Sequence, residues 1–551
     1  MFVRFTRDYQ AGSGRMFLGG EVVDVDARWG NQLIAAGAAT LNATASNPVT
    51  LVTDPLTGGK SIQDGSGNVL FCAGLAPVGD PPAGLGWDSA RYPVTAYISA
   101  SGQDRPVGAV PSMDPVLATH FATALAATPI YVDKSTGNDT TGNGSIGNKY
   151  ATYTKAQQVA NAGGVPAHII MIGGPTREYQ LAEGFNGSAI QPTVPTIITA
   201  SNGIVRSSTR YSATFGGSKD ATYTNTYVAA IATTMIARLV MLRKLKEGSD
   251  EGEDAIRVAD AATCNATPGS YSVVGTNLYY NPWDGIAPTS ANTSVFQAGT
   301  GNARMAGASP VSVWLRTETD RDGWLLEGGS TGAFRAVYSA LPAQQIILAM
   351  DNVRMRYAGT RHASNVNQGV QSRQVEVDGL HGLLIARNCH VGSSGDDGWN
   401  IHRTLGGAST YVLLVNCTGE RSGIPDPSAS APIQSCNVVT PHEDVTMIVV
   451  GGSFERSYGR TFYAVGSSKT WIVGPVFGKS FGDRMAGGSF DPCELGLGNT
   501  AEVWIDRVEL RPVGGGFPAI AVDDTAKLHV RNALPLGNKI SVSAGATVDS
   551  Y

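Results

Sequence analysis

The chain has 551 residues, a formal net charge of −5 at pH 7 and a sequence pI near 5.9. Its 68 glycines far exceed the usual share of roughly 7 %, and its charged residues, at 15 %, fall below the usual ~25 %. This composition disfavours a helical protein, while a hydrophobic fraction of 42 % excludes disorder. The acidic balance, without clustered Lys and Arg, excludes nucleic acid as an expected partner.

Targeting and redox signals are sparse. No stretch approaches the roughly 18 apolar residues of a membrane span, and the N-terminus has no signal-peptide core, so we expect neither a span nor bacterial secretion. The cysteines form neither a dense disulfide framework nor a CxxC metal pair, so we expect buried thiols from a reducing cytosol. They are Cys72, Cys264, Cys389, Cys417, Cys436 and Cys493.

The first 128 residues read as two small parts. Residues 1–45 predict an α+β attachment module, with strands in MFVRFTRDY and GGEVVDVD and a short helix in NQLIAAGAAT. Residues 46–128 predict a neck or adaptor of short strands, with a helix near DPVLATHFATALAATP at 114–129.

From Ile130 the pattern changes. The segment 130–162 predicts a strand, a turn rich in Gly, Asn and Asp, and a helix whose Ala156, Val159 and Ala160 would cap one end of a solenoid. The run 227–248 has helical propensity, but its weak period also suits two β-helix strands. The segment 264–289, CNATPGSYSVVGTNLYYNPWDGIAPT, predicts a hairpin.

An internal repeat in the C-terminal half decides the fold class. Strand-like runs recur at spacings of 36, 28, 36, 22, 33 and 25 residues, anchored on Asn352, Asn388, Asn416, Gly452, Gly474, Arg507 and Asn532. Stacked coils of 22 to 36 residues would give such spacings, with Asn or Gly supplying the unusual φ at each corner. We therefore predict an all-β parallel β-helix over 129–551, irregular over 129–345 and regular over 346–551, rather than separate β-sandwiches. Cys389 and Cys417 would stack on adjacent coils as thiols.

The densest polar segment is NCHVGSSGDDGWNIHRT at 388–404. Strand alternation would turn Trp399 and Ile401 inward and display Asn400 and His402, with Asp396 in phase, on the outer surface. Asp397 would sit at a glycine-flanked bend and could turn outward too. Counting from the corners, and leaving out the loop 423–434, places His442 over His402. The same counting gathers one neighbourhood, which comprises Asp396, His402, Glu420, His442, Glu443 and Asp444.

Paired carboxyl groups point to glycoside hydrolysis, which needs one acid and one base or nucleophile. The catalytic candidates are Asp396, Asp397 and Glu420, with His402 or His442 tuning a carboxyl pKa or binding a substrate acid group. β-Elimination is the other enzymatic option, with His402, His442, Arg403 and Arg421 as base and cations. The structural alternative is that the Asp pair only caps a turn and that His442 has a packing role.

Substrate-binding candidates surround these groups. They are Asn400, Arg403, Arg421, Glu443 and Asp444, with the aromatic residues Trp283, Tyr279, Tyr280, Trp324 and Trp399 available to stack on sugars. Trp283 is placed for exposure, whereas the alternation places Trp399 in the core. No metal and no cofactor is expected, because His442, Glu443 and Asp444 are consecutive and would diverge on an extended chain.

Several motifs resemble known β-helix proteins. The opening at 130–162 and the run PGSYSVVGTNLY resemble phage tailspikes with a pectate-lyase-like right-handed parallel β-helix. DDGWNIH and TPHEDVTMIVVGG resemble phage and bacterial β-helix proteins, and GDD resembles polygalacturonases, although their GHG and RxK segments are not evident.

The tailspike resemblance implies a function and an assembly. It implies recognition, and preferably cleavage, of a bacterial surface polysaccharide by a homotrimer. It also implies a location in the virion tail after synthesis in the host cytoplasm, with other virion proteins bound through the N-terminal module. A non-catalytic virion spike that binds glycan or serves a structural role is the alternative. A bacterial polysaccharide-processing enzyme is a further one, disfavoured by the missing signal peptide and by the N-terminal module.

Overall fold

The structure is a computed structural model that divides into two compact units, Met1–Leu75 and Ala76–Tyr551. The boundary falls inside the segment 46–128 that the sequence assigns to a neck. The first unit is described only through its strands. In the second unit the described residues are 75–99, 105–175, 177–180, 191–211, 215–231, 236–246, 250–297, 311–328, 333–338, 344–358, 375–402, 409–423, 436–457, 459–478, 493–511, 518–532 and 540–551.

The first unit contains short antiparallel strands. The two strands expected at the N-terminus form and pair with each other as β1 and β4, and β5 lies on the other side of β1. The expected helix at 31–40 ends in β5, and its positions 31–38 lie outside the described residues. The strands are β1 (Phe2–Phe5), β2 (Tyr9–Gln10), β3 (Met16–Phe17), β4 (Val22–Asp24), β5 (Ala39–Leu41), β6 (Thr50–Thr53), β7 (Lys60–Gln63) and β8 (Val69–Cys72).

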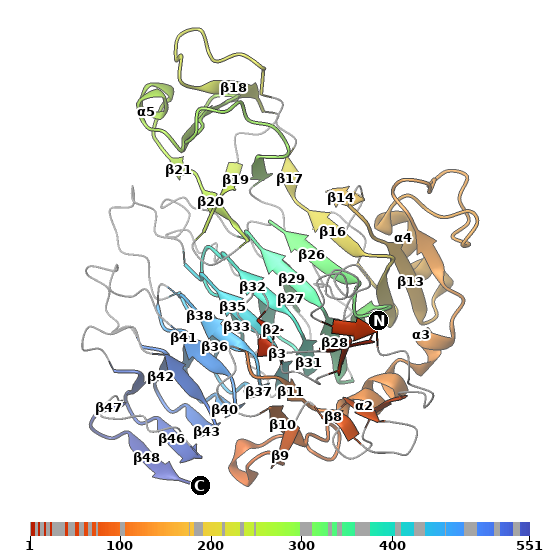
Figure 1. Cartoon of the computed structure of the whole chain (residues 1–551), viewed down its shortest axis with the longest axis vertical. Coiled ribbons are helices and arrows are strands. Elements are labelled where there is room, and N and C mark those ends of the chain that lie inside the picture. Colours follow the sequence, from red (N-terminus) through yellow and green to blue (C-terminus); the bar gives the residue numbers. More distant parts are fainter. Residues whose placement is uncertain are drawn as a thin grey trace. The chain divides into compact units, whose positions relative to one another are not determined.

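Three long parallel sheets build the second unit (Figure 1). The twelve-stranded sheet consists of β12 (Ile130–Val132), β13 (Ala167–Ile172), β15 (Thr196–Ser201), β25 (Val313–Thr317), β28 (Ile346–Asp351), β31 (Gly382–Arg387), β34 (Thr410–Val415), β37 (Thr446–Val450), β40 (Lys469–Val473), β43 (Glu502–Asp506), β46 (Lys527–Arg531) and β48 (Thr547–Ser550).

The two other sheets are shorter. The nine-stranded sheet consists of β14 (Glu178–Gln180), β16 (Ile204–Ser208), β26 (Gly323–Glu327), β29 (Val353–Arg356), β32 (His390–Gly392), β35 (Thr418–Glu420), β38 (Ser453–Glu455), β41 (Val476–Gly478) and β44 (Glu509–Arg511). The eight-stranded sheet consists of β27 (Phe334–Val337), β30 (Val375–Asp378), β33 (Trp399–Ile401), β36 (Val439–Pro441), β39 (Phe462–Ala464), β42 (Leu495–Leu497), β45 (Ile520–Val522) and β47 (Ile540–Val542).

Each regular coil contributes one strand to each sheet in chain order, which confirms the predicted parallel β-helix and excludes separate β-sandwiches. The inward side chains of all three sheets form one continuous core, in which Trp399, Ile401 and Phe454 are fully buried. Cys389 and Cys417 stack there on adjacent coils as free thiols, as expected. Burial raises the pKa of the Cys389 thiol, with a further contribution from Cys417.

The corners between the twelve- and nine-stranded sheets carry the repeat. Asn352, Asn388 and Asn416 have φ of 53°, 54° and 53°, in the left-handed region that Asn tolerates better than most residues. Strand register places Gly451, and not the expected Gly452, over Asn416, because Val450 pairs with Val415. Both glycines have positive φ, so either satisfies the sequence pattern. The true spacings are 36, 28, 35, 23, 33 and 25 residues.

Helix α4 (Tyr153–Gly163) lies at one end of the coils, as predicted, and begins at Thr152, whose hydroxyl accepts from the Lys155 amide. Ala156 and Ala160 are buried against the core, but Val159 is 36 % exposed and takes no part in the cap.

Part of the segment assigned to a neck packs on the β-helix instead of standing apart from it. Leu85, Trp87 and Met113 share an apolar cluster with outward residues of the twelve-stranded sheet, including Ile385. The expected helix near 114–129 forms as two helices joined at Phe121. The elements are β9 (Leu75–Gly79), η1 (Ala83–Leu85), β10 (Ala96–Ser99), β11 (Gly108–Ala109), α2 (Met113–His120) and α3 (Ala122–Ala126).

An insertion over 210–297 projects from the coils (Figure 1). The run 227–248 forms strands, but they belong to small antiparallel sheets and not to coils, so that expectation is wrong in placement. The predicted hairpin at 264–289 is confirmed as β22 and β23. The elements are β17 (Arg210–Tyr211), β18 (Tyr227–Ala230), β19 (Ile236–Leu245), β20 (Gly252–Asp254), β21 (Ile256–Arg257), α5 (Ala261–Ala266), β22 (Ser270–Val274), β23 (Asn277–Asn281) and β24 (Thr293–Gln297). Among the described residues, no helix has the length and apolar character needed to cross a membrane.

Candidate functional site

A groove of about 1270 Å³ runs along the outer face of the nine-stranded sheet. Its floor takes residues from consecutive strands: Arg206 from β16, Leu325 from β26, Arg354 from β29, His390 from β32 and Thr418 from β35. Register pairs each of these residues with the next, so they form one ladder across five coils. At about 4.8 Å per strand, the ladder covers roughly 20 Å.

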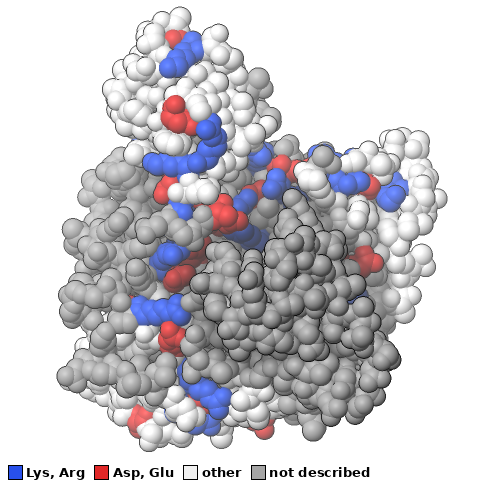
Figure 2. All heavy atoms as spheres, viewed as in Figure 1, with Lys and Arg blue, Asp and Glu red and all other residues white. Residues whose placement is uncertain are grey.

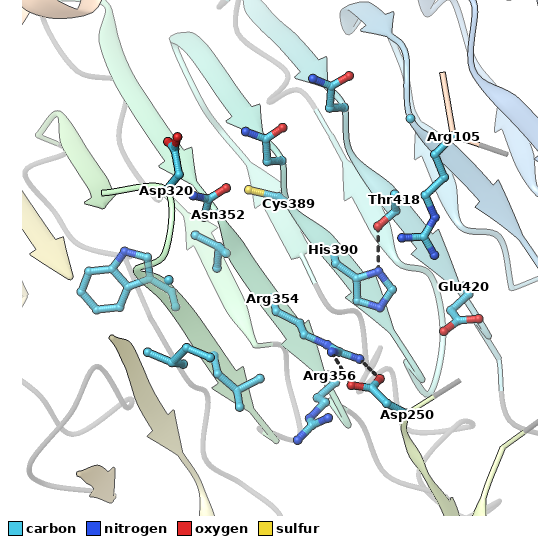
Figure 3. A pocket seen from close by; sticks show the side chains of 18 of the residues that line it. Arg105, Asp250, Asp320, Asn352, Arg354, Arg356, Cys389, His390, Thr418 and Glu420 are labelled. Carbon is cyan, nitrogen blue, oxygen red and sulfur yellow. Dashed lines mark hydrogen bonds and ion pairs between the residues drawn. The ribbon is translucent and has the colours of Figure 1, made fainter. Parts of the chain in front are cut away.

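A second outward ladder runs two residues farther along each strand. It pairs Glu327 with Arg356, Arg356 with Gly392, Gly392 with Glu420 and Glu420 with Glu455. Figure 3 shows Arg354, His390, Thr418 and Glu420 projecting from adjacent strands into the same space. Figure 2 shows acidic and basic side chains alternating in a band below the insertion. The outer face of this sheet is therefore polar and of mixed charge.

The groove has built walls. Leu245, Lys246 and Asp250 line it from the insertion. The turn after β25 contributes Asp322, whose carboxylate accepts from the Gly203 amide at 2.6 Å and from Thr319, so this wall is braced.

Buried charges hold the insertion against the coils. Arg238 is 1 % exposed and forms a two-point contact with Asp254 at 2.7 and 2.8 Å. The ammonium of Lys246 lies 3.2 Å from Asp254 and also donates to Ser393 of the coil. Burial lowers the pKa of Lys246. Truncating one member of such a cluster leaves another charge buried and uncompensated.

Glu251 lies beneath the groove floor and is fully buried. Burial opposes its charge, but contacts from His390, Lys246 and Ser393 outweigh burial and hold its pKa far below the usual range. A Cβ added at Gly392 would lie 2.3 Å from the Glu251 carboxylate, so glycine is required there for the close approach. The sequence gave no local signal for this contact, because the partners come from the insertion and a coil.

His390 and Arg354 converge on that carboxylate from the coil side. His390 Nδ1 lies 2.8 Å from Thr418 Oγ1, and its Nε2 lies 3.8 Å from Glu251. Arg354 contacts Glu251 at 3.6 Å and forms a two-point hydrogen bond with Asp250. Hydrogen bonds from Arg354 lower the pKa of Asp250. Sequence reasoning missed these residues, although His390 and Arg354 hold matching places two positions after Asn388 and Asn352.

Glu420, a predicted catalytic residue, lies in the groove. Its Oε2 accepts from Arg456 at 3.0 Å and lies 3.8 Å from Arg421 Nε. Glu455 occupies the matching position on the next coil. Both follow their corner, Asn416 or Gly451, by four residues, so correct placement of the corner would have found the pair.

The predicted stack of His402 and His442 is confirmed. The two rings lie nearly parallel, 13° apart, with centroids separated by 4.0 Å. His402 Nδ1 lies 3.1 Å from the carboxylate of Glu443, which is therefore in the same cluster. These groups follow strands of the eight-stranded sheet, whereas Glu420 ends a strand of the nine-stranded sheet. Asp444 is exposed.

Other predicted residues have different places. Asp397 is 6 % exposed and accepts from the Asn437 amide of the next coil at 2.6 Å, which supports the turn-capping alternative. Asp396 lies in the same turn, where its carbonyl accepts from the Gly423 amide. Asn400 is fully buried, so its expected display on the surface is wrong. Arg403 lies outside the described residues.

The aromatic candidates separate by burial. Trp324 and Trp399 are in the core, and Tyr280 is 2 % exposed. Tyr279 packs edge-on against Tyr223. Trp283 is exposed as predicted, at 42 %, with the Lys244 ammonium 5.9 Å from its ring centroid.

No protein-family model matches this chain, and no curated protein matches its sequence significantly. Three solved structures are similar in fold at 10 % sequence identity. A glycoside hydrolase has a TM-score of 0.37, with 76 % of this chain and 99 % of that chain covered. The Pseudomonas phage phi297 tailspike gp61 has 0.18, with 72 % and 70 % covered. The Gp54 tailspike of Acinetobacter baumannii bacteriophage AP22, in complex with capsular saccharide, has 0.15, with 71 % and 76 % covered. These low scores carry no argument about function.

Proposed function

We propose that this chain binds a bacterial surface polysaccharide in the groove along the nine-stranded sheet. The observation that carries the proposal is the uninterrupted ladder from Arg206 to Thr418, which lines one groove over successive coils. A cleft of this form suits a linear polymer rather than a small molecule, because equivalent positions repeat at the spacing of the strands.

The groove combines the two kinds of contact that sugars use. Ile204 and Leu245 line it with side chains that are 52 % and 56 % exposed, and they offer apolar surface to sugar ring faces. Arg354, Thr418 and Glu420 offer hydrogen-bonding groups to hydroxyls. Trp283 adds an exposed ring on the insertion.

Cleavage is the second part of the proposal, and hydrolysis is preferred. Glu420 and Glu455 occupy paired positions on adjacent strands, where backbones lie about 4.8 Å apart. That placement suits two cooperating carboxyl groups, one protonating the leaving oxygen and the other attacking carbon or activating water. Asp397 is not included because its carboxylate caps a turn, while Asp396 remains a candidate.

Two alternatives remain. β-Elimination is supported by His390 beside Arg354, since that reaction needs a base and a cation that stabilises the developing charge. A non-catalytic spike that only binds glycan would use the same groove. We also propose, from the sequence resemblance, that the protein is a homotrimeric tailspike in the virion tail and that residues 1–45 attach it to other virion proteins.

Incubation with purified capsular polysaccharides and lipopolysaccharide O-chains tests the function. Biosensor binding, new reducing ends and absorbance of unsaturated uronic acid separate a binder, a hydrolase and a lyase. The proposal expects binding by the wild-type chain and new reducing ends that are lost in Glu420→Gln. Glu509→Gln is the matched control, because Glu509 lies on the same sheet beside Arg511 but outside the groove. Absence of binding to every polymer of the natural host would contradict the proposal.

A further inference from the structure

Three metal-ligand side chains meet at the ends of two adjacent strands, away from the groove. Ile401 pairs with Pro441, so His402 and His442 follow at the same level of neighbouring coils. Glu443 has a φ of 47°, and its carboxylate lies 3.1 Å from His402 Nδ1. One donor atom from each of the three lies within 4.8 Å of the others.

The donor set selects a class of ion. Two imidazole nitrogens and one carboxylate oxygen are ligands that Zn²⁺ takes in sites of three protein ligands and one open position. We propose that His402, His442 and Glu443 bind a divalent ion of the zinc class across two adjacent coils. The sequence argument against a metal was that residues 442–444 diverge, but this site takes only two of them and adds His402 from the preceding coil.

Binding requires a defined adjustment. Metal–nitrogen distances of about 2.0–2.1 Å place tetrahedral ligands roughly 3.4 Å apart, so the donors must draw closer by about 1 Å. The rings are nearly parallel, and two parallel rings 4.0 Å apart do not aim lone pairs at one point. Rotation of the His442 ring about its Cβ–Cγ bond provides that convergence. Both histidines are partly exposed, which gives an ion access from solvent.

A buried amide supports His402 from behind. Asn400 is fully buried, and its side-chain amide lies 3.1 Å from His402 Nε2. With its oxygen turned to the ring, the amide accepts a proton from Nε2 and leaves the Nδ1 lone pair for the ion. Metal-bound histidines almost always have such a partner on the second nitrogen, and its loss costs about 10–100-fold in affinity.

The preceding coil offers a further carboxylate. Val377 pairs with Ile401, so Asp378 holds the position of His402 one coil earlier. The column therefore runs Asp378, His402 and His442 along the coils, with Glu443 beside it. An ion held there would link the coils and, because it binds the folded chain, would raise the temperature of unfolding.

Titration of the metal-free chain with Zn²⁺ alone tests the site. We expect one Zn²⁺ per chain by calorimetry and elemental analysis, and a higher unfolding temperature. His402→Ala and His442→Ala should each lower affinity by at least about 100-fold, and Glu443→Gln by about 10-fold. His529→Ala is the matched control, because His529 also contacts a carboxylate, Glu502 at 2.9 Å, and its loss should leave Zn²⁺ binding unchanged.

Two results would overturn the proposal. One is a wild-type chain that binds no Zn²⁺ at micromolar concentrations. The other is undiminished binding in both His402→Ala and His442→Ala. The visible spectrum of the wild-type chain with Co²⁺ checks the site without a mutation, since imidazole ligands in a tetrahedral site give intense bands and surface-bound ion does not. No glycan enters these experiments, so their outcome is independent of the polysaccharide proposal.

Discussion

The imidazole rings of His402 and His442 lie face to face, 4.0 Å apart, although forty residues separate them in the chain. Their contact follows from strand register, because β33 and β36 are adjacent parallel strands that end immediately before the two histidines. The same register builds the groove ladders on the nine-stranded sheet. Long-range placement in this fold is thus set by where each coil begins.

The exposed aliphatic side chains of the groove provide the first prediction. Ile204→Asp and Leu245→Asp should each weaken polysaccharide binding by about tenfold or more, because they replace apolar contact surface with charge. Val165→Asp is the control, since Val165 is 62 % exposed and lies outside the groove. Biosensor titration measures the three affinities, and equal losses in all three would argue against the groove.

Glu420 provides the second prediction. Glu420→Gln should lower the rate of reducing-end release by about 10²–10⁴-fold, since it removes a proton-transferring group while preserving the shape of the side chain. Binding affinity should change much less. Glu509→Gln should retain wild-type turnover. Normal cleavage by Glu420→Gln would assign the chemistry to other groups.

The buried ion cluster under the insertion provides the third. Arg238→Met should cost about 3–5 kcal/mol, because it takes away the two-point partner of the buried Asp254. Arg243→Met, which removes an exposed partner of Asp284, should cost about 0–1 kcal/mol. Denaturant unfolding and the rate of proteolysis within 210–297 measure the difference. Similar small effects in both variants would show that the cluster does not fix the insertion.

Asp133 provides a prediction about pH. Burial opposes its charge, but hydrogen bonds from Arg177, Thr136 and Ser135 outweigh it and lower its pKa to about 2. The folded value lies below the unfolded one, so its contribution to stability is present above about pH 4 and is lost as pH falls towards 2. Asp133→Asn should therefore be less stable than wild type at pH 6, and the gap should shrink at acid pH. A gap independent of pH would refute this assignment.

The sequence predicted the coils well, because their corners have a local chemical requirement. Asn388 and Asn416 stand where the backbone is left-handed, and few residue types tolerate that conformation. The pattern was ambiguous only where two glycines are adjacent, at Gly451 and Gly452. The stack of His402 on His442 followed from the same counting.

The groove could not be predicted in the same way. Glu251 reaches His390 from an insertion that carries no coil repeat, and nothing near either residue marks the contact. Asp397 misled in the opposite direction, since a carboxylate that caps a turn and a catalytic carboxylate share the same glycine-flanked pattern. The antiparallel pairing of β19 was hidden because its apolar run suits several kinds of strand.

The most direct test of the central claim is a structure of the chain with an oligosaccharide from a polymer that it binds. We predict sugar density along the ladder from Arg206 to Thr418, with ring faces against Ile204 and Leu245 and with Glu420 near a glycosidic oxygen. Sugar density confined to another face of the coils, with the groove empty, would contradict the account.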